Sequence, residues 1–400
     1  MRIESLELEE FRAYRRLRLD IGAPGLALHG ENGSGKSPLL EAISMLATTR
    51  SPRTSFEREV VNWASGVEFG FPPFSRVAGT VISGGERRQI EISLVLEREG
   101  GAAIKKQVRL DGRAVRSSTA VGILRTVLFT PEDVGLITGT PGDRRRYLDV
   151  MLCQLDRGYL RALAEHAKVL AQRNSLLKQF ARDGVSPASR AVIEQLGFWD
   201  QRLVAAGAQL LARRATAIGA LDRFARECFG RLDGGAFAFR YAPALDTWER
   251  LAGIEADHAD LGALVAQAML DELERRRPEE LRRGVTLVGP HRDEVVFTLD
   301  GRSMASFGSR GQQRLGVLAA KLAEVALMTL DGGEPPVLLL DDVLSELDAR
   351  HRGLLLETAA GDGCQVLITA TDAALLDDPR LAGLPAARID PGSVKVLNLP

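Results

Sequence analysis

The sequence predicts an α/β fold that is built from both ends of the chain and interrupted by a helical arm. Near the N-terminus, the apolar run Leu26-Ala27-Leu28 precedes a glycine-rich turn and a stretch with the apolar spacing of a helix. Near the C-terminus, residues 337–340 and 366–369 are short, continuous apolar runs typical of buried strands. Between these regions, residues 144–277 are helical in type and rich in Ala, Leu and Arg. Strand-forming ends around a helical segment indicate an α/β domain that carries an insertion.

Length and composition indicate one large or two smaller folded units. The chain has 400 residues, 45% of them hydrophobic, which is enough for a sizeable core. Its 52 basic and 53 acidic residues leave a net charge of −1, so composition gives no support for nucleic-acid binding. Three widely spaced cysteines, Cys153, Cys228 and Cys364, indicate a reducing compartment. Because the N-terminus lacks an apolar signal core and no apolar run is long enough for a membrane span, we expect a cytoplasmic protein.

The N-terminal third predicts strands. Residues 3–8 and 17–19 have strand patterns on either side of a turn, and the residues between them, 11–16, combine aromatic and basic side chains. Such a cluster is either a solvated turn or a loop that stacks on bases and contacts phosphates. Residues 77–110 alternate between apolar and polar positions, bounded by turns at Ser83-Gly84-Gly85 and Gly100-Gly101. This alternation predicts an antiparallel meander with one solvent-exposed face, and a further strand follows at residues 127–129.

The middle of the chain predicts a helical hairpin. Two long helical segments, near residues 144–182 and 191–229, are separated by residues 183–187. Within this turn, Ser186 is placed to cap the second helix and Pro187 to start it. The apolar face of the first segment consists of Leu160, Leu163, Ala167 and Leu170. No strict heptad persists, which argues against a long coiled coil.

The last part of the chain returns to strands and tight turns. Residues 295–299 predict a strand that enters a hairpin at Asp300-Gly301. A helix then begins near Ser309, and its apolar side consists of Leu315, Leu318, Leu322, Val325 and Met328. The strand at residues 337–340 runs into Asp341-Asp342, and the strand at 366–369 into Thr371-Asp372.

The glycine-rich turn has the G-x-x-x-x-G-K-[ST] spacing between a strand and a helix, which predicts a nucleoside-triphosphate site. Its backbone N–H groups and the helix start would surround phosphate oxygens, Lys36 would add a full charge, and Ser37 would bind Mg²⁺. Pro38 is tolerated in the first helical turn, where N–H groups lack intrahelical partners. The predicted phosphate-binding residues are Gly30, Glu31, Asn32, Gly33, Ser34, Gly35, Lys36 and Ser37.

Two further stretches complete the predicted ATP and Mg²⁺ site. Adjacent acids at the end of an apolar strand lie beside a cation or water if the strand ends next to the phosphate loop; otherwise they only cap the strand. Asp341 would then hold Mg²⁺ with Ser37, and Asp342 would orient or deprotonate the attacking water. A third group could contact the γ-phosphate through a hydroxyl, a close backbone approach and a helix N-terminus: Ser309, Gly311 and Gln312. The alternative is that these residues only cap a helix.

The order of these motifs resembles the ABC-type ATPase head of SMC-like proteins and, within that group, the RecF family of bacterial gap repair. The stretches that carry the resemblance are residues 30–42, 129–133, 145–149, 289–293, 309–314 and 339–348. The resemblance implies a P-loop head, made of a mixed sheet and an antiparallel meander, with an inserted α-helical arm. It implies a division into an N-terminal head part (1–143), the arm (144–283) and a C-terminal head part (284–400).

The resemblance also implies a mechanism. Two subunits would trap ATP, so that residues 30–37 of one face Ser309, Gly311 and Gln312 of the other, and weak, DNA-stimulated hydrolysis would release the dimer. The dimer would bind gapped DNA at single-strand/double-strand junctions and act with RecO and RecR to load RecA. Candidate phosphate contacts are Arg12, Arg15, Arg16, Arg144 and Arg145, whereas the basic run at 275–283 is equally consistent with a solvated helix end.

The sequence departs from the family pattern at several positions. Pro38 replaces a polar residue, and Pro52 stands where the family tends to have histidine. Thr371 or Asp372 is a candidate for the switch position, and Glu132 or Asp133 for the γ-phosphate sensor. The competing interpretations are the ATPase subunit of a membrane transporter, a structural SMC-like protein and a P-loop kinase for a small metabolite. The long insertion argues against the first, the lack of a long coiled coil against the second, and residues 309–314 against the third.

Overall fold

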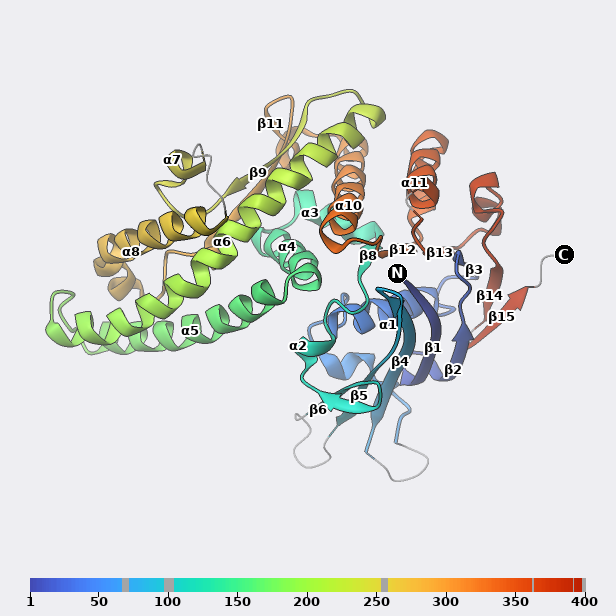
Figure 1. The fold of residues 1–400 in the computed structure, drawn as a ribbon, viewed down its shortest axis with the longest axis horizontal. Helices are drawn as coiled ribbons and strands as arrows, with labels where there is room; N and C mark the ends of the chain where they lie inside the picture. Colours follow the sequence, from blue (N-terminus) through green and yellow to red (C-terminus); the bar gives the residue numbers. More distant parts are fainter. Residues whose placement is uncertain (67–71, 97–103, 253–257, 362, 391, 398–400) are drawn as a thin grey trace. The chain divides into compact units, whose positions relative to one another are not determined.

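The computed structural model describes residues 1–66, 72–96, 104–252, 258–361, 363–390 and 392–397 (Figure 1). The chain divides into two compact units. The first unit combines Met1–Asp133 with Ala320–Pro400, and the second unit is Val134–Ala319. The two ends of the chain thus fold together, as the sequence predicts.

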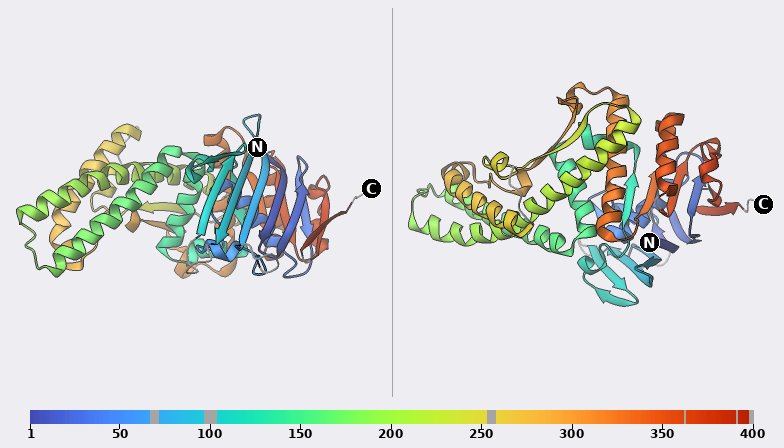
Figure 2. Two further views of the ribbon diagram at one scale, coloured as in Figure 1. Left: turned by 90° about the horizontal axis from the view of Figure 1, so that it is seen from below. Right: turned by 45° about the horizontal axis from the view of Figure 1, so that its top comes forward.

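An antiparallel sheet forms one layer of the first unit (Figure 2). Its strands, in spatial order, are β2 (Tyr14–Asp20), β1 (Arg2–Phe11), β4 (Phe74–Ser83), β5 (Glu86–Leu96), β6 (Ile104–Leu110) and β7 (Arg113–Val115). Along β5, Ile90, Ile92 and Leu94 are buried, which confirms the predicted meander with one core face. The predicted boundary at Gly100-Gly101 lies outside the described residues.

A mixed sheet forms the second layer of this unit. Its strands, in spatial order, are β15 (Ser393–Leu397), β14 (Ala386–Asp390), β3 (Gly25–His29), β13 (Val366–Ala370), β12 (Val337–Asp341) and β8 (Thr126–Phe129). All neighbours are parallel except β14 and β15. The carboxyl ends of β3, β12 and β13 therefore lie at one edge, where ligands of such sheets bind.

Helix α1 (Lys36–Thr48) packs against strands of both sheets. Leu39, Leu40, Ile43 and Leu46 are fully buried, because the helix is apolar on nearly every side. The buried polar residues of this helix include Glu41. Its carboxylate accepts hydrogen bonds from Arg12 at 2.6 and 3.0 Å and from the Ser51 hydroxyl at 2.5 Å. The remaining helices of this unit are α2 (Ser117–Ala120), α11 (Ala349–Gly361) and the end of α10 (Arg310–Gly332).

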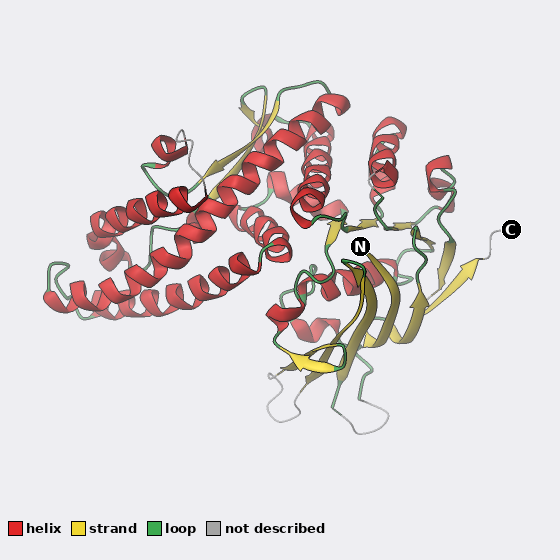
Figure 3. Cartoon of the chain, viewed as in Figure 1, coloured by secondary structure: helices red, strands yellow, loops and turns green. Residues whose placement is uncertain are grey.

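The second unit is mostly helical (Figure 3). Its helices are α3 (Gly135–Thr138), α4 (Pro141–Leu155), α5 (Arg157–Arg182), α6 (Arg190–Leu232), α7 (Trp248–Ala252), α8 (His258–Arg283), α9 (Met304–Phe307) and the start of α10. A small antiparallel sheet joins β9 (Phe237–Ala242), β10 (Glu294–Leu299) and β11 (Arg302–Ser303). The hairpin between β10 and β11 turns at Asp300 and Gly301, both with positive φ, as the sequence predicts. Within the described ranges, no helix is both long and apolar enough to span a lipid bilayer.

The pairing of β9 with β10 keeps the chain beyond residue 283 within the second unit. The sequence-based division instead assigned residues 284–400 to the head. Residues up to Ala319, including Ser309 to Gln312, belong to the unit that contains the helical arm. A strand pair that joins segments more than fifty residues apart leaves no local sequence signal, which accounts for the difference.

The helical hairpin begins and ends at other residues than predicted. Asp156 interrupts the first predicted helix, because its carboxylate accepts hydrogen bonds from the N–H groups of Gly158 and Tyr159 and caps α5. The assignment of Ser186 and Pro187 as cap and first residue of the second helix is wrong. The Ser186 carbonyl closes a turn by accepting from the Ser189 N–H at 3.0 Å, and Ser189 caps α6.

The buried face of α5 is shifted from the predicted one. Leu160, Leu163 and Leu170 are only partly buried, and Ala167 is exposed. The buried positions are Tyr159, Ala162, His166, Val169, Arg173, Leu177 and Phe180. Two of these are polar, so a search for apolar spacing misses this face.

Arg173 links three segments of the second unit from a fully buried position on α5. Its guanidinium donates to Asp200 at 2.7 Å, to Glu280 at 2.6 Å and to the Thr286 hydroxyl at 2.9 Å. The two carboxylates come from α6 and α8, so this cation lies where the three long helices meet. A buried charge is tolerated when its partners neutralise it and satisfy its donors.

Replacing this cation should strongly destabilise the second unit. In Arg173→Met, Asp200 and Glu280 lose their buried partner, and we expect the free energy of unfolding to fall by about 3–5 kcal/mol. Urea unfolding followed by circular dichroism measures the change. The matched control is Arg190→Met at the exposed start of α6, which removes only a surface pair with Glu194 and should cost about 0.5 kcal/mol or less. Equal unfolding midpoints for the two variants would contradict the role of Arg173.

Candidate functional site

The loop from Gly30 to Ser37 joins β3 to the start of α1. Gly33 and Gly35 have φ angles of 80° and 111°, a region that side chains rarely adopt. A Cβ at Gly35 would also lie 2.6 Å from the Tyr14 hydroxyl. That hydroxyl donates to the Gly35 carbonyl at 3.0 Å. The curvature of the loop is therefore determined both by glycine and by the buried Tyr14 beneath it.

The polar side chains of the loop suit a phosphate ligand. Lys36 Nζ donates to the carbonyls of Gly30 and Glu31 at 2.7 and 2.8 Å, so its ammonium lies across the loop. Burial lowers the pKa of Lys36, and the charges of Asp342 and Asp341 oppose that shift. Within the described part of the chain, the buried Ser34 Oγ has no hydrogen-bond partner. An orphaned hydroxyl beside a lysine and a helix N-terminus fits the oxygens of a triphosphate.

Asp341 lies at the end of β12 and contacts the phosphate loop. Its Oδ1 accepts hydrogen bonds from Ser37 Oγ and from Thr369 Oγ1, both at 2.9 Å. Burial raises the pKa of Asp341, and these bonds together with the charge of Arg53 oppose the rise. A hydroxyl and a carboxylate in contact are hard oxygen ligands of the kind that hold Mg²⁺ beside nucleotide phosphates. Helix α1 begins at Lys36, so Pro38 lies in its first turn.

Asp342 adopts a strained backbone conformation, with a φ angle of 54°. Its N–H donates to Thr369, and its Oδ1 accepts from the Thr371 hydroxyl at 3.1 Å and from the Thr371 N–H at 3.3 Å. Thr371 therefore orients the candidate catalytic carboxylate. Asp372, the other candidate for the switch position, instead caps a short helical turn through the Ala374 N–H.

The segment after β8 brings a second acid toward Asp341. The charge of exposed Glu132 raises the pKa of Asp341, whereas the Asp133 carboxylate accepts from the Thr130 N–H at 2.7 Å. Of the two candidate sensors, Glu132 is thus the one whose charge acts on Asp341. Lys321 of α10, which the sequence analysis missed, holds this segment by donating to the Leu128 carbonyl at 2.8 Å.

Ser309, Arg310 and Gly311 are exposed at the start of α10. The Ser309 hydroxyl accepts from the Gln312 N–H at 3.2 Å, and the Gln312 side chain accepts from the Ser309 N–H at 3.0 Å. This reciprocal pair is a capping box that orders the helix start without burying it. The next residue, Gln313, is buried and donates to the Met304 carbonyl.

Comparison with known proteins identifies the family. Residues 2–381 match the family described as RecF/RecN/SMC N terminal domain. The chain is 47% identical over 400 residues to the DNA replication and repair protein RecF of Thermomicrobium roseum, with 99% of this chain and 100% of the relative covered. The chain belongs to the RecF family.

Solved structures agree with this assignment. The recombination mediator protein RecF with ATPrS superimposes with a TM-score of 0.82 and 28% identity, covering 99% of this chain and 98% of that one. An Smc head bound to a ScpA domain, at 16% identity and a TM-score of 0.53, shares the fold. The predicted ABC/SMC-type head is confirmed. RecF membership also favours this interpretation over a transporter ATPase, a structural SMC protein or a small-molecule kinase.

Two stretches that carry the RecF resemblance converge on Arg214, which the sequence analysis missed. This buried arginine of α6 donates to Asp149 at 2.7 Å, to Asp293 at 2.9 Å and to the Pro290 carbonyl at 2.7 Å. Burial lowers the pKa of the neighbouring His291 to about 4, so this imidazole is neutral at neutral pH. The motif residues Asp149 and Asp293 are therefore positioned by an internal ion pair within the second unit.

Several predicted DNA contacts of the RecF-type chain are engaged elsewhere. Assigning Arg144 as a phosphate contact is wrong, because it is buried and donates to both carboxylate oxygens of Glu294 at 2.6 and 2.8 Å. Arg12 is held by Glu41, and Arg145 donates to the Asp293 carbonyl at 2.6 Å. Arg15 and Arg16 are exposed on β2.

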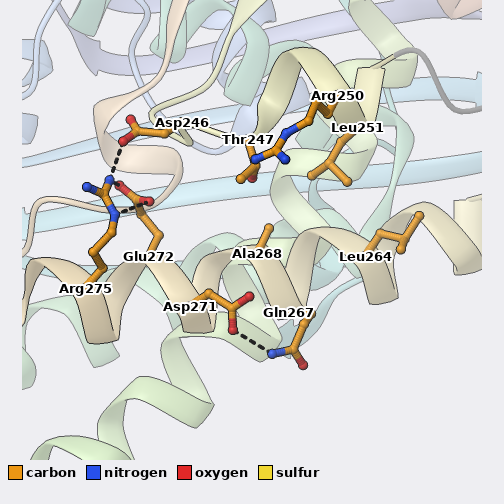
Figure 4. Close-up of a pocket in the computed structure, with 10 residues that line it drawn as sticks. All are labelled: Asp246, Thr247, Arg250, Leu251, Leu264, Gln267, Ala268, Asp271, Glu272 and Arg275. Atoms are coloured by element: carbon orange, nitrogen blue, oxygen red, sulfur yellow. Dashed lines mark hydrogen bonds and ion pairs between the residues drawn. The ribbon is translucent and has the colours of Figure 1, made fainter.

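In two other candidate regions, the aromatic or basic side chains are buried or paired within the protein. Phe11 and Tyr14 are fully buried, so these rings do not stack on bases, which was one of the two alternatives for residues 11–16. In the hollow beside α7 and α8, Arg275 forms ion pairs with Glu272 and Asp246 (Figure 4). Arg276 bonds the same two acids. At the start of the basic run at 275–283, neighbouring acids thus neutralise the arginines on the helix surface.

The contact between Thr371 and Asp342 should matter for turnover and not for ATP binding. Thr371→Val removes the hydroxyl that orients Asp342, and we expect ATP hydrolysis to slow about tenfold, the effect of one hydrogen bond to a charged group. Thr371→Ser keeps the hydroxyl and should retain most of the rate. Single-turnover hydrolysis and nucleotide titration separate the two effects, and a valine variant as fast as the serine variant would contradict this role.

Proposed function

We propose that this RecF-family chain acts in DNA replication and repair as an ATP-driven dimer. In this proposal the ATP-bound dimer binds gapped DNA at single-strand/double-strand junctions. With RecO and RecR it would help RecA to load, and slow, DNA-stimulated hydrolysis would release it. The names of its relatives and the nucleotide in the matched RecF structure support the role in repair and the use of ATP.

The exposure of the α10 start is the main observation in support of the proposed dimer. The phosphate loop, Asp341 and Asp342 supply one half of an ATP site in the first unit. Ser309 and Gly311 present a hydroxyl and helix N–H groups to solvent from the second unit. A helix start of this kind binds phosphate oxygens, and a second copy of the chain would bring them.

The chemistry at the proposed interface needs few protein groups. Lys36 and the loop N–H groups would neutralise the β- and γ-phosphates, and Ser37 with Asp341 would hold Mg²⁺. Asp342, oriented by Thr371, would accept a proton from the attacking water. Charge that develops on the γ-phosphate would be stabilised by Ser309 and the α10 N-terminus of the partner copy. Hydrolysis would then require the dimer, and its rate would set how long the dimer persists.

Removal of the loop ammonium tests the ATP-driven assembly. Lys36→Met should abolish ATP-dependent dimerisation, because the triphosphate loses its main counter-charge. Analytical ultracentrifugation with and without ATP, on gapped and on blunt duplex DNA, measures nucleotide dependence, dimer and DNA preference together. A variant that dimerises with ATP like the wild type would refute the phosphate-loop assignment.

The shared site can be tested by complementation. Ser309→Arg should block dimerisation and hydrolysis while ATP binding by the monomer remains, and Asp342→Asn should dimerise without hydrolysis. In an equimolar mixture, each heterodimer has one site with two normal halves, so hydrolysis should recover to at most about a quarter of the wild-type rate, the value for random pairing, and to less because Ser309→Arg weakens pairing. If Ser309→Arg alone hydrolysed ATP normally, the two-subunit site would be excluded.

A further inference from the structure

Trp63 is almost fully exposed, although the backbone on both sides of it is firmly held. Its side chain is 96% exposed. The adjoining Asn62 is buried; its N–H donates to the Glu10 carbonyl at 2.8 Å, and its side-chain amide donates to the Arg12 carbonyl at 2.7 Å. Asn62 Oδ1 also accepts from the Ala64 N–H at 2.9 Å. The indole is therefore presented to solvent by a fixed turn.

This turn lies beside the exposed arginines of β2. Phe11 at the end of β1 pairs with Tyr14 on one side and with Val61 on the other. Two strand spacings, about 10 Å, therefore separate the backbone next to Arg15 from the backbone next to Trp63. A second exposed ring, Phe56, lies seven residues before Trp63, and the Arg58 guanidinium carbon is 5.7 Å from its centroid.

The charges around these rings suit a polyanion. Within residues 12–16 and 53–63, the exposed charged side chains are one acid, Glu59, and four arginines: Arg15, Arg16, Arg53 and Arg58. The Glu59 carboxylate already accepts from the Thr54 hydroxyl at 2.6 Å. Partly buried Glu57 is paired with Lys106. On β1, which lies between these segments, partly buried Glu9 is paired with Arg76, and Glu10 adds one further acid. The four exposed arginines outnumber Glu59 and Glu10, so the local charge is positive on a chain whose overall net charge is −1.

We propose that Trp63, with Phe56 and the neighbouring arginines, stacks on the bases of the single-stranded part of the DNA junction. Exposed rings among arginines are the arrangement that single-strand binders use, because each base offers a face for stacking and each phosphate a charge. Tryptophan and arginine also occur at protein-protein contacts, so the experiments below include purified protein partners as well as DNA. The inference rests on the DNA binding proposed above and assigns it a contact surface.

Tryptophan fluorescence tests this directly, because the two other tryptophans, Trp199 and Trp248, are partly buried in the second unit. The full-length chain with ATP and Mg²⁺ is titrated with an oligo-dT strand and with blunt duplex. We expect oligo-dT to quench the fluorescence of the wild type and of Trp199→Phe, and blunt duplex to quench it much less. Trp63→Phe should bind oligo-dT with little loss but without that quenching.

Removing the ring should weaken single-strand binding. Trp63→Ala should bind oligo-dT about tenfold or more weakly, the effect of losing one stacked base, while duplex affinity, ATP-dependent dimerisation and the unfolding midpoint stay unchanged. Wild-type binding to oligo-dT without quenching, and with unchanged affinity in Trp63→Ala, would overturn the stacking surface and leave the proposed function intact. Loss of binding to purified RecR or RecO in Trp63→Ala, with normal DNA binding, would overturn it in favour of a protein contact. A wild type that binds neither these probes nor gapped duplex in the presence of ATP would refute the proposed function itself.

Discussion

The hydrogen bond from Ser37 to Asp341 joins residues 304 positions apart, and the nucleotide site depends on it. It can form because β3, β13 and β12 are parallel neighbours whose carboxyl ends meet at one edge. Thr369, from the strand between them, bonds the same carboxylate oxygen. The second unit can therefore be inserted between the two halves of the head without disturbing the site, provided that the register of these strands is kept.

Arginine ion pairs play a similar role elsewhere in the chain. Partly buried Arg12 binds the buried Glu41 of the first unit, while buried Arg173 and Arg214 each bind two carboxylates from separate segments of the second unit. A buried cation with several hydrogen-bonded partners has few alternative arrangements, so it favours one packing of the surrounding helices. Arg214 also gives Asp149 and Asp293, which lie in two stretches that carry the resemblance to RecF, a structural role as acceptors of its hydrogen bonds.

The sequence predicted those parts of the molecule that are encoded locally. The phosphate loop, the strand before Asp341-Asp342 and the hairpin at Asp300-Gly301 follow from glycine spacing and from short apolar runs. The cap at Ser189, the buried face of α5 and the partners of the buried arginines depend on which distant segments pack together. The same limit explains the error at Arg144. The local sequence around a basic residue at a helix start does not show whether its side chain faces solvent or, as here, binds Glu294.

The internal use of arginine constrains how such a protein can hold DNA. With a net charge of −1 and several arginines bound to its own carboxylates, the chain has no overall excess of positive charge that would favour counterion release from the phosphate backbone. Two other sources of affinity remain. An ATP-joined pair of copies doubles the contacts along one strand and raises the effective concentration of the second site. Stacking on exposed rings adds affinity that depends little on salt and discriminates for unpaired bases. In the function proposed above, preference for a gap would therefore come from the pairing of two copies and from aromatic contacts, and comparatively little from bulk charge.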